Sequence, residues 1–288
     1  MSTARKIMIT GSAGFIGQHL REALAQANPD DELVPVGSPR SAGEDLIKID
    51  LGDKAAVERL IQERRPTHIV HLAGNKNLGY CERNADEVRP INLESTQTIC
   101  EAMPADCRLV FLSSDYVFDG ERGNYAETDE PAPGTVYGSM KYESERMIQK
   151  SCERYTIIRT GGVYGVGGRF FDWILDSLKG DGRVEAFVDT RFTPTYIGDL
   201  LRVILSVLDA DDNALYHVAG PVSVSRYEMA CAVARTLGED ESRVDKSSVA
   251  DSGMLIPADN SLNSDWTRKR LGETFTGVVE GIPLVLGN

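Results

Sequence analysis

A tyrosine and a lysine four residues apart, Tyr137 and Lys141, are the side chains in this sequence that best suit proton transfer. If the segment is helical, residues at i and i+4 share a face, so the phenol and the ammonium group lie side by side. A nearby ammonium group favours the phenolate and makes tyrosine a better proton-transfer group near neutral pH. Because the chain contains ten tyrosines, the spacing alone also fits an ordinary exposed pair on a helix.

A second group of polar residues directly follows an apolar run. Ser113, Ser114 and Asp115 come after Leu109-Val110-Phe111-Leu112, which has the composition of a buried strand. Polar side chains at the carboxyl end of a parallel strand lie beside the ligand site of an α/β sheet. The Ser114 hydroxyl would hold a substrate oxygen there, and the alternative is a serine that only caps the end of the strand.

Three glycines at a spacing of three, Gly11, Gly14 and Gly17, connect a short apolar strand at 6–10 to a helical pattern at 15–27. Glycine permits the tight turn and lets backbone N–H groups approach a pyrophosphate. The start of the helix adds free donors and a partial positive charge. The arrangement predicts a dinucleotide site, and the alternative is a turn that only packs the helix on the strand.

The residues after the second predicted strand, 33–37, indicate which dinucleotide would bind. An acidic residue is expected about 20 positions after the glycine loop when the ribose 2′-hydroxyl is bound. The chain has Gly37 there, with Ser38 and Arg40 just beyond. A small residue, a hydroxyl and an arginine suit a 2′-phosphate, so NADP is favoured over NAD. The alternative is that Arg40 is a solvated loop charge.

The elements that must position these groups alternate along the first half of the chain. Apolar runs predict strands at 6–10, 33–37, 46–50, 68–74 and 108–113. Helical patterns cover 15–27, a segment that ends at Arg65 before Pro66, 84–103 and 137–151. This order predicts an α/β fold with a doubly wound parallel sheet, whose ligands bind beyond the carboxyl ends of the strands.

The second half has a different pattern. Helices are predicted at 170–178, at 198–208 and from Ser225 to about 237, where Glu228 completes a capping box. The last helix is predicted near 264–271, and the polar stretch 75–86 is expected to be a substrate-side loop. Two arginines, Arg169 and Arg191, are the candidates for binding a substrate diphosphate, with solvated surface arginines as the alternative.

Composition narrows the class of protein. The net charge of −13 argues against nucleic acid or an anionic membrane surface as partners. The five cysteines are scattered without CxxC spacing, as expected for reduced thiols in the cytoplasm, and no metal site is expected. The apolar stretch after Arg5 and Lys6 ends at Gly11, so it is too short for a signal peptide or a membrane span.

At these positions the chain resembles the extended short-chain dehydrogenase/reductase superfamily. The matching pieces are Thr10-Gly11-x-x-Gly14-x-x-Gly17, Asp50-Leu51, His71-Leu72-Ala73-Gly74, Asn92, Ser113-Ser114 and Tyr137-x-x-x-Lys141. The stretch Ser114-Asp115-Tyr116-Val117-Phe118-Asp119-Gly120 is especially similar to the dTDP-4-dehydrorhamnose reductase group, which includes the regulatory β subunit of methionine adenosyltransferase. The resemblance covers nearly the whole chain.

The resemblance implies a Rossmann NAD(P)-binding domain at 1–165 and a mainly substrate-binding lobe at 166–288, interleaved with the first. Tyr137 would donate a proton to the substrate carbonyl, Ser114 would hydrogen-bond that carbonyl with Asp115 beside it, and Lys141 would hold the nicotinamide ribose. The implied cofactor contacts are Gly11, Gly14, Phe15, Ile16 and Gly17 at the pyrophosphate, Ser38 and Arg40 at the adenosine 2′ position, Asp50 and Leu51 at the adenine, and Ala73, Gly74 and Asn92 along the cofactor.

The function that the resemblance implies is NADP-dependent reduction of a 4-keto nucleotide-diphosphate sugar. Alternatives are a nucleotide-sugar epimerase or dehydratase, and a non-catalytic NADP-binding regulatory subunit. The group is often dimeric, so a homodimer is one option. Three departures from the reductase pattern leave the sugar open. Gly162 replaces a bulky aromatic residue, Phe192-Thr193 replaces a glycine, and Ile256 replaces an arginine.

Overall fold

The computed structural model describes residues 4–180 and 182–287, and their contacts divide the chain into two compact units. Unit 1 consists of Met1–Val117, Thr135–Ile158 and Leu201–Leu215, and unit 2 of Phe118–Gly134, Arg159–Leu200 and Tyr216–Asn288. The chain therefore passes between the units several times. The functional division at residue 165 is a separate prediction that this contact pattern does not test.

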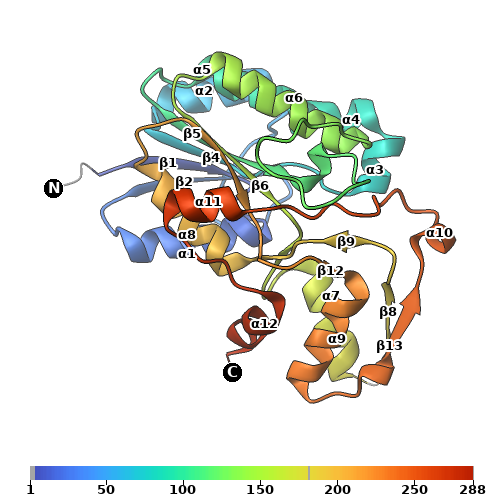
Figure 1. The fold of residues 1–288 in the computed structure, drawn as a ribbon. Coiled ribbons are helices and arrows are strands. Elements are labelled where there is room, and N and C mark those ends of the chain that lie inside the picture. The colour runs from blue at the N-terminus through green and yellow to red at the C-terminus, as the bar shows by residue number, and fades with distance from the viewer. Residues whose placement is uncertain (1–3, 181, 288) are drawn as a thin grey trace. The chain divides into compact units, whose positions relative to one another are not determined.

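The central sheet has seven strands. They are β1 Lys6–Thr10, β2 Glu32–Gly37, β3 Ile47–Lys48, β4 His68–His71, β5 Arg108–Ser114, β6 Tyr155–Thr160 and β11 Ala214–Val218. Their order is β11-β6-β5-β4-β1-β2-β3 (Figure 1), and the pairs from β3 to β5 are parallel. Because the sheet grows outward from β1 in both directions, it is doubly wound, as predicted.

Helices cover both faces of this sheet, which explains why its strands are almost continuously apolar. In β1, the side chains of Ile7, Met8 and Ile9 are all buried. The helices of this part are α1 Phe15–Ala27, α2 Lys54–Arg64, α5 Ser95–Ala102 and α6 Val136–Ser151. Helices α2, α5 and α6 pack side by side on one face, and α1 lies on the other (Figure 1). Strand β1 and helix α1 have the predicted bounds.

Local side-chain chemistry sets the start and end of α2. Asp53 is its N-cap and accepts a hydrogen bond from Ala56 N at 3.1 Å. Asp50, the alternative cap, instead accepts from Gly52 N at 2.9 Å in the preceding turn. The helix ends at Arg64, and its C-cap Arg65 adopts a left-handed conformation immediately before Pro66. A stop at this proline is therefore confirmed.

Two expectations for residues 75–103 are wrong. The predicted continuous helix is divided into α4 Ala85–Arg89, a π-helical turn at Pro90–Glu94, and α5. Pro90 has no N–H to donate, and Ser95 N bonds to its carbonyl, which is the wider π spacing. The predicted loop at 75–86 contains helix α3 Leu78–Arg83, because the Asn77 side chain caps it by accepting from Tyr80 N.

Unit 2 consists of short strand pairs and helices around its own core. The strand pairs are β7 Val163–Tyr164 with β10 Thr195–Tyr196, β8 Val184–Phe187 with β13 Val244–Ser247, and β9 Arg191–Phe192 with β12 Val224–Ser225. The helices are α7 Arg169–Lys179, α9 Arg226–Leu237, α10 Val249–Ser252, α11 Asp265–Leu271 and α12 Val278–Leu286, and α8 Ile197–Leu208 continues into unit 1. The capping box of Ser225 and Glu228 is present.

The expectation that the last helix lies near 264–271 is wrong, because α12 follows that helix. Pro283 lies inside α12 and hides its helical pattern in the sequence. Ile282 is fully buried and belongs to the core of unit 2. Among the residues that the structure describes, no helix combines the length and hydrophobicity needed to cross a membrane.

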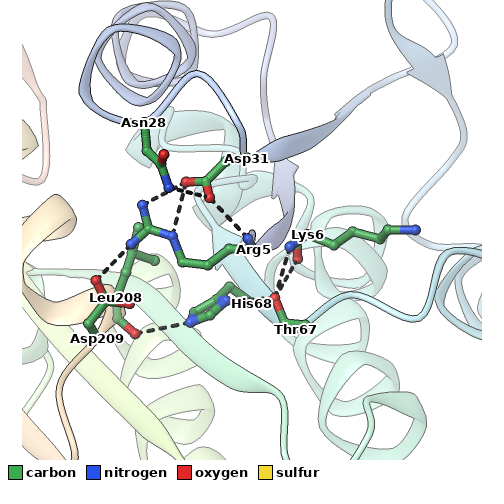
Figure 2. A network of polar contacts seen from close by, with 8 residues as sticks. All are labelled: Arg5, Lys6, Asn28, Asp31, Thr67, His68, Leu208 and Asp209. Atoms are coloured by element: carbon green, nitrogen blue, oxygen red, sulfur yellow. Dashed lines mark hydrogen bonds and ion pairs between the residues drawn. The ribbon is translucent and has the colours of Figure 1, made fainter. Parts of the chain in front are cut away.

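A network of polar contacts ties the start of β1 to two other parts of unit 1 (Figure 2). Arg5 donates to the Asp31 carboxylate from its backbone N and from Nε and Nη2 of its guanidinium group, at 2.6–3.0 Å. The same guanidinium reaches Asp209 just after α8, and His68 Nε2 lies 3.0 Å from the Leu208 carbonyl oxygen. The Asp31 side chain is only 1% exposed. The network therefore contains a nearly buried ion pair.

Candidate active site

The glycine loop brings the ends of two strands and the start of α1 into close contact. Gly11 has φ +74°, and a Cβ there would lie 3.0 Å from Ala73 N. A Cβ on Gly17 would lie 2.3 Å from the Gly11 carbonyl oxygen. Gly14, the N-cap of α1, has no side chain to occupy the first N–H groups of the helix. The loop therefore leaves the first backbone N–H groups of the helix as donors, next to a space without side chains. This arrangement fits a pyrophosphate.

This packing predicts the effect of one added methyl group. Gly17→Ala would force the Gly11 carbonyl to move, because backbone atoms block the new Cβ. We expect NADP affinity, measured by calorimetry, to fall about tenfold or more. Gly134→Ala is the control, since the nearest atom to its Cβ is 4.0 Å away. Equal NADP affinity in the two variants would contradict a cofactor-binding role for this loop.

Ser114, Asp115 and Tyr137 come together because α6 starts against the end of β5. A Cβ on Gly138 would lie 2.0 Å from the Tyr116 carbonyl oxygen, so only glycine allows this approach. The Tyr116 and Tyr137 rings are 6.1 Å apart between centroids. Ser114 Oγ donates to Asp115 Oδ1 at 2.8 Å, and both residues are buried. A hydroxyl, a carboxylate and a phenol therefore share one corner of unit 1.

Lys141 is a buried ammonium group beside this corner. Its Nζ donates to the Leu112 carbonyl oxygen at 2.9 Å, and lies 6.0 Å from the centroid of the Tyr137 ring. Burial lowers its pKa to about 8, although the Glu145 carboxylate acts in the opposite direction. A Cβ on Gly74 would lie 3.9 Å from Nζ, so the lysine also faces the segment after β4. Lys141 therefore connects the tyrosine to the predicted cofactor-binding residues.

The effect of Lys141 on the pKa of Tyr137 stays a prediction, because burial dominates that pKa in this structure. Burial raises the pKa of Tyr137, the Asp115 charge raises it further, and hydrogen bonding by Ser114 only partly offsets this. The Lys141 ammonium group itself donates to the Leu112 carbonyl oxygen. A raised pKa favours the neutral phenol of Tyr137. A neutral phenol can give a proton to a substrate oxygen but does not readily take one.

Asn92 holds the segment that follows β4. Its Oδ1 accepts from Asn75 N at 2.6 Å, and its Nδ2 donates to the Asn75 carbonyl oxygen at 2.9 Å. A Cβ on Gly74 would lie 3.4 Å from the same Oδ1. Asn92 lies in the π-helical turn, a feature that is frequent at functional sites. This side chain therefore fixes the backbone along which the predicted cofactor would lie.

The other predicted cofactor residues occupy the neighbouring strand ends. Ser38 and Arg40 are exposed after β2, where Ser38 N donates to Ser41 Oγ at 3.0 Å. Asp50 is also exposed, whereas Leu51 is 7% exposed and packs in the core of unit 1. Phe15, Ile16 and Ala73 are half-buried around the glycine loop. Their contacts with a dinucleotide stay predictions.

The two arginines predicted to meet a substrate diphosphate both lie in unit 2 and are both exposed. Arg169 is the first residue of α7. Arg191 donates to Ser223 Oγ at 3.1 Å and to the Ser223 carbonyl oxygen at 2.6 Å, and pairs with Glu228 at 3.4 Å. Most of the donors on Arg191 are therefore already in use, and its role with substrate stays a prediction.

Two buried residues in unit 1 support the site but were not singled out from the sequence as functional. His71 lies 2.6 Å from Thr10 Oγ1 and 3.2 Å from Thr96 Oγ1, and burial lowers its pKa to about 3, so it is neutral. Glu145 accepts from Ser113 Oγ at 2.5 Å and acts on Lys141. Its position four residues after Lys141 was a signal in the sequence that could have identified it.

Comparisons with known proteins cover nearly the whole chain. The family model of the RmlD substrate binding domain matches residues 5–281. A dTDP-4-dehydrorhamnose reductase of Mycobacterium tuberculosis is 30% identical over 84% of this chain and 78% of its own length. Methionine adenosyltransferase 2 subunit beta of Danio rerio is 28% identical over 80% of this chain and 73% of its own length.

This chain is also similar to a solved structure, both in its fold and in the length that the match covers. The dTDP-4-dehydrorhamnose reductase from Bacillus anthracis, in complex with NADP, superposes with a TM-score of 0.88. The two proteins are 25% identical, and the match covers 99% of each chain. The similarity therefore includes the segments of both units.

Proposed function

Because this chain belongs to the family of the RmlD substrate binding domain, we propose that it is an oxidoreductase that reduces a 4-keto nucleotide-diphosphate sugar with NADPH. One observation carries this proposal. Ser114, Asp115, Tyr137 and Lys141 meet at the end of β5, where burial raises the pKa of Tyr137 and favours its neutral phenol. An acid aimed at a substrate carbonyl is what the reduction of a ketone requires.

Each residue of this corner has its own role in the proposed reduction. Bound NADPH would supply the hydride to the keto carbon. Tyr137 would deliver its proton to the carbonyl oxygen, and the Ser114 hydroxyl would hold that oxygen in place. Asp115, which accepts from Ser114 at 2.8 Å, would orient the hydroxyl. Lys141 would hold the nicotinamide ribose, since it lies beside Gly74 at the end of β4.

The exposed residues after β2 support NADP as the preferred cofactor. Ser38 and Arg40 offer a hydroxyl and a guanidinium where NAD-binding chains carry an acidic residue. An arginine there matches the geometry and charge of a 2′-phosphate. NAD stays the alternative, because both side chains are solvated.

The direct test is the loss of NADPH absorbance with a panel of nucleotide-diphosphate 4-keto-6-deoxy sugars, repeated with NADH. We expect oxidation with at least one member of the panel, and a kcat/KM at least about tenfold higher with NADPH than with NADH. Tight NADPH binding without oxidation of any member would contradict the reductase. Equal rates with the two cofactors would contradict the role of Ser38 and Arg40.

A second candidate is a regulatory subunit that binds NADP without turnover. The similarity to methionine adenosyltransferase 2 subunit beta favours it, as do the changes at Gly162, Phe192 and Ile256. The complete set of Ser114, Tyr137 and Lys141 favours an enzyme instead. An epimerase or dehydratase would use the same set, and would convert the sugar without net loss of NADPH. The homodimer and the cytoplasmic location stay predictions.

A further inference from the structure

Helix α6 buries two residues of opposite charge one turn apart, Lys141 and Glu145. Residues at i and i+4 share one face of a helix, so both side chains leave α6 on the same side. Neighbouring residues of β5 hold them there. Lys141 Nζ donates to the Leu112 carbonyl oxygen at 2.9 Å, and Ser113 Oγ donates to Glu145 Oε1 at 2.5 Å. The lysine and the glutamate are therefore anchored to the same end of one strand.

The contact with Ser113 indicates that Glu145 is ionised. A hydroxyl that donates to a carboxylate lies about 2.5–2.7 Å from it, closer than in a hydrogen bond between neutral groups. The Ser113 contact falls in this range. A buried carboxylate has lost its hydration, and a positive charge nearby offsets that loss. Lys141 supplies such a charge on the same face of α6.

Other titratable groups approach Lys141 from β4, from α6 and from the end of β5. Burial and the charge of Lys141 lower the pKa of His71 to about 3, so the imidazole is neutral. The pKa of Tyr137 is raised, which favours the neutral phenol, and the charge of Asp115 acts on that phenol. Burial lowers the pKa of Lys141 to about 8, and Glu145 acts against this effect. Glu145 therefore supports the ammonium form of the lysine.

The remaining charged groups around this part of α6 lie on α3 and on the π-helical turn. Burial raises the pKa of Cys81, which favours its neutral thiol. Glu82 accepts from a backbone N–H in the first turn of α6, at 2.7 Å. Glu94 is exposed and pairs with Arg89 at 3.4 Å. These groups therefore have partners or surroundings of their own.

We infer that Glu145 is a positioning residue, which keeps Lys141 in its ammonium form for the ribose hydroxyls of the cofactor. The contact of Lys141 with the ribose rests on the proposed function. An ammonium group has three N–H donors and no acceptor. One donor is used by the Leu112 carbonyl oxygen, and the others can hold ribose hydroxyls. Ser113 fixes the direction of the Glu145 carboxylate and so acts through Glu145.

A purely structural role for Glu145 predicts a different outcome, and Glu145→Gln separates the two. The variant keeps the size of the side chain, and its amide oxygen can still accept from Ser113 Oγ. It removes only the charge that supports the ammonium form of Lys141. Without that charge the pKa of Lys141 should fall, whereas a packing role would leave this pKa unchanged.

The first measurement is an NMR titration of the full chain without cofactor, labelled with ¹³C at lysine Cε. The Lys141 signal is the one that is missing from Lys141→Arg. We expect it to titrate near pH 8 in the wild type, and about one pH unit lower in Glu145→Gln. Glu145→Asp keeps the charge and should fall between the two. Glu143→Gln is the matched control, because Glu143 is exposed on the same helix and should leave the midpoint unchanged.

Calorimetry with NADPH across the same pH range is the second measurement. Wild-type affinity should fall about threefold or more as Lys141 loses its proton, and this loss should begin at lower pH in Glu145→Gln. Equal Lys141 midpoints in the two proteins, or an affinity that does not follow the titration, would overturn the inference. A wild-type Lys141 that titrates below about pH 6 would also overturn it, and this criterion holds even if Glu145→Gln fails to fold.

The outcome is separable from that of the proposed function. Sugar reduction by a protein whose Lys141 midpoint is the same in Glu145→Gln would reject only the inference. A shifted midpoint with matching NADPH binding, in a protein that reduces no sugar, would reject only the reductase.

Discussion

Tyr137→Phe is expected to lower kcat by about a hundredfold to ten-thousandfold with any nucleotide sugar that the wild type reduces. The variant keeps the ring that packs 6.1 Å from Tyr116, and loses only the hydroxyl whose pKa burial and Asp115 raise. NADPH affinity, measured by calorimetry, should stay within about twofold of the wild type, because the hydroxyl serves the substrate. The KM for NADPH should change equally little.

Tyr142→Phe is the matched control, because Tyr142 lies on the same helix, near Arg146. It should retain wild-type kcat. Turnover at the wild-type rate in Tyr137→Phe would reject Tyr137 as the proton donor. Both variants should also unfold at the temperature of the wild type. If both lost activity and neither showed the wild-type melting transition, the loss would come from misfolding, and the proton-donor role would again lose its support.

Asp31→Asn is expected to destabilise the protein by about 3–5 kcal/mol, the range found when one partner of a buried ion pair is removed. The Arg5 side chain is 11% exposed and that of Asp31 is 1% exposed, so the arginine would keep its charge without its main partner (Figure 2). Urea unfolding at pH 7 measures the change. Asp209→Asn is the control, because Asp209 is 65% exposed and should cost less than about 1 kcal/mol.

The same pair predicts how stability depends on pH. Burial alone would raise the pKa of Asp31, but the hydrogen bonds and charge of Arg5 outweigh it and hold the pKa below its ordinary value. A carboxyl whose pKa is lowered on folding stabilises the protein above the pKa of the unfolded chain, about 4, and loses this effect as the pH falls through the folded-state pKa. Wild type and Asp31→Asn should therefore converge in stability below about pH 4. A constant difference down to pH 2 would contradict this assignment.

The sequence was most informative where one local signal determines the geometry. Gly11 follows β1 and Gly17 lies in the first turn of α1, and the bounds of both elements were predicted. The contacts that a Cβ would make at these two glycines explain their spacing. The i, i+4 spacing of Tyr137 and Lys141 likewise requires only a helix. Such features depend on neighbours within one or two turns, which a sequence displays directly.

Features that depend on distant partners could not be predicted. The direction of the Lys141 ammonium group is determined by the Leu112 carbonyl on another element, which the spacing of Tyr137 and Lys141 does not reveal. The π-helical turn was missed although Pro90 is visible, because a proline in a helical pattern also allows a kink or an end. The pairing of β9 with β12 was also not predicted, because no local pattern indicates which distant strands pair.

The interleaving of the two units bears on how the chain folds during synthesis. The segment Leu201–Leu215 belongs to unit 1 and carries Asp209, which contacts Arg5 near the start of the chain. Domains usually fold as units in the order in which they are synthesised. Unit 1 cannot be completed until residue 215 has left the ribosome, and by then the first two segments of unit 2 have emerged completely. A fragment that ends at residue 165 would lack β11 and this late contact, so β6 and not β11 would be the edge strand of its sheet.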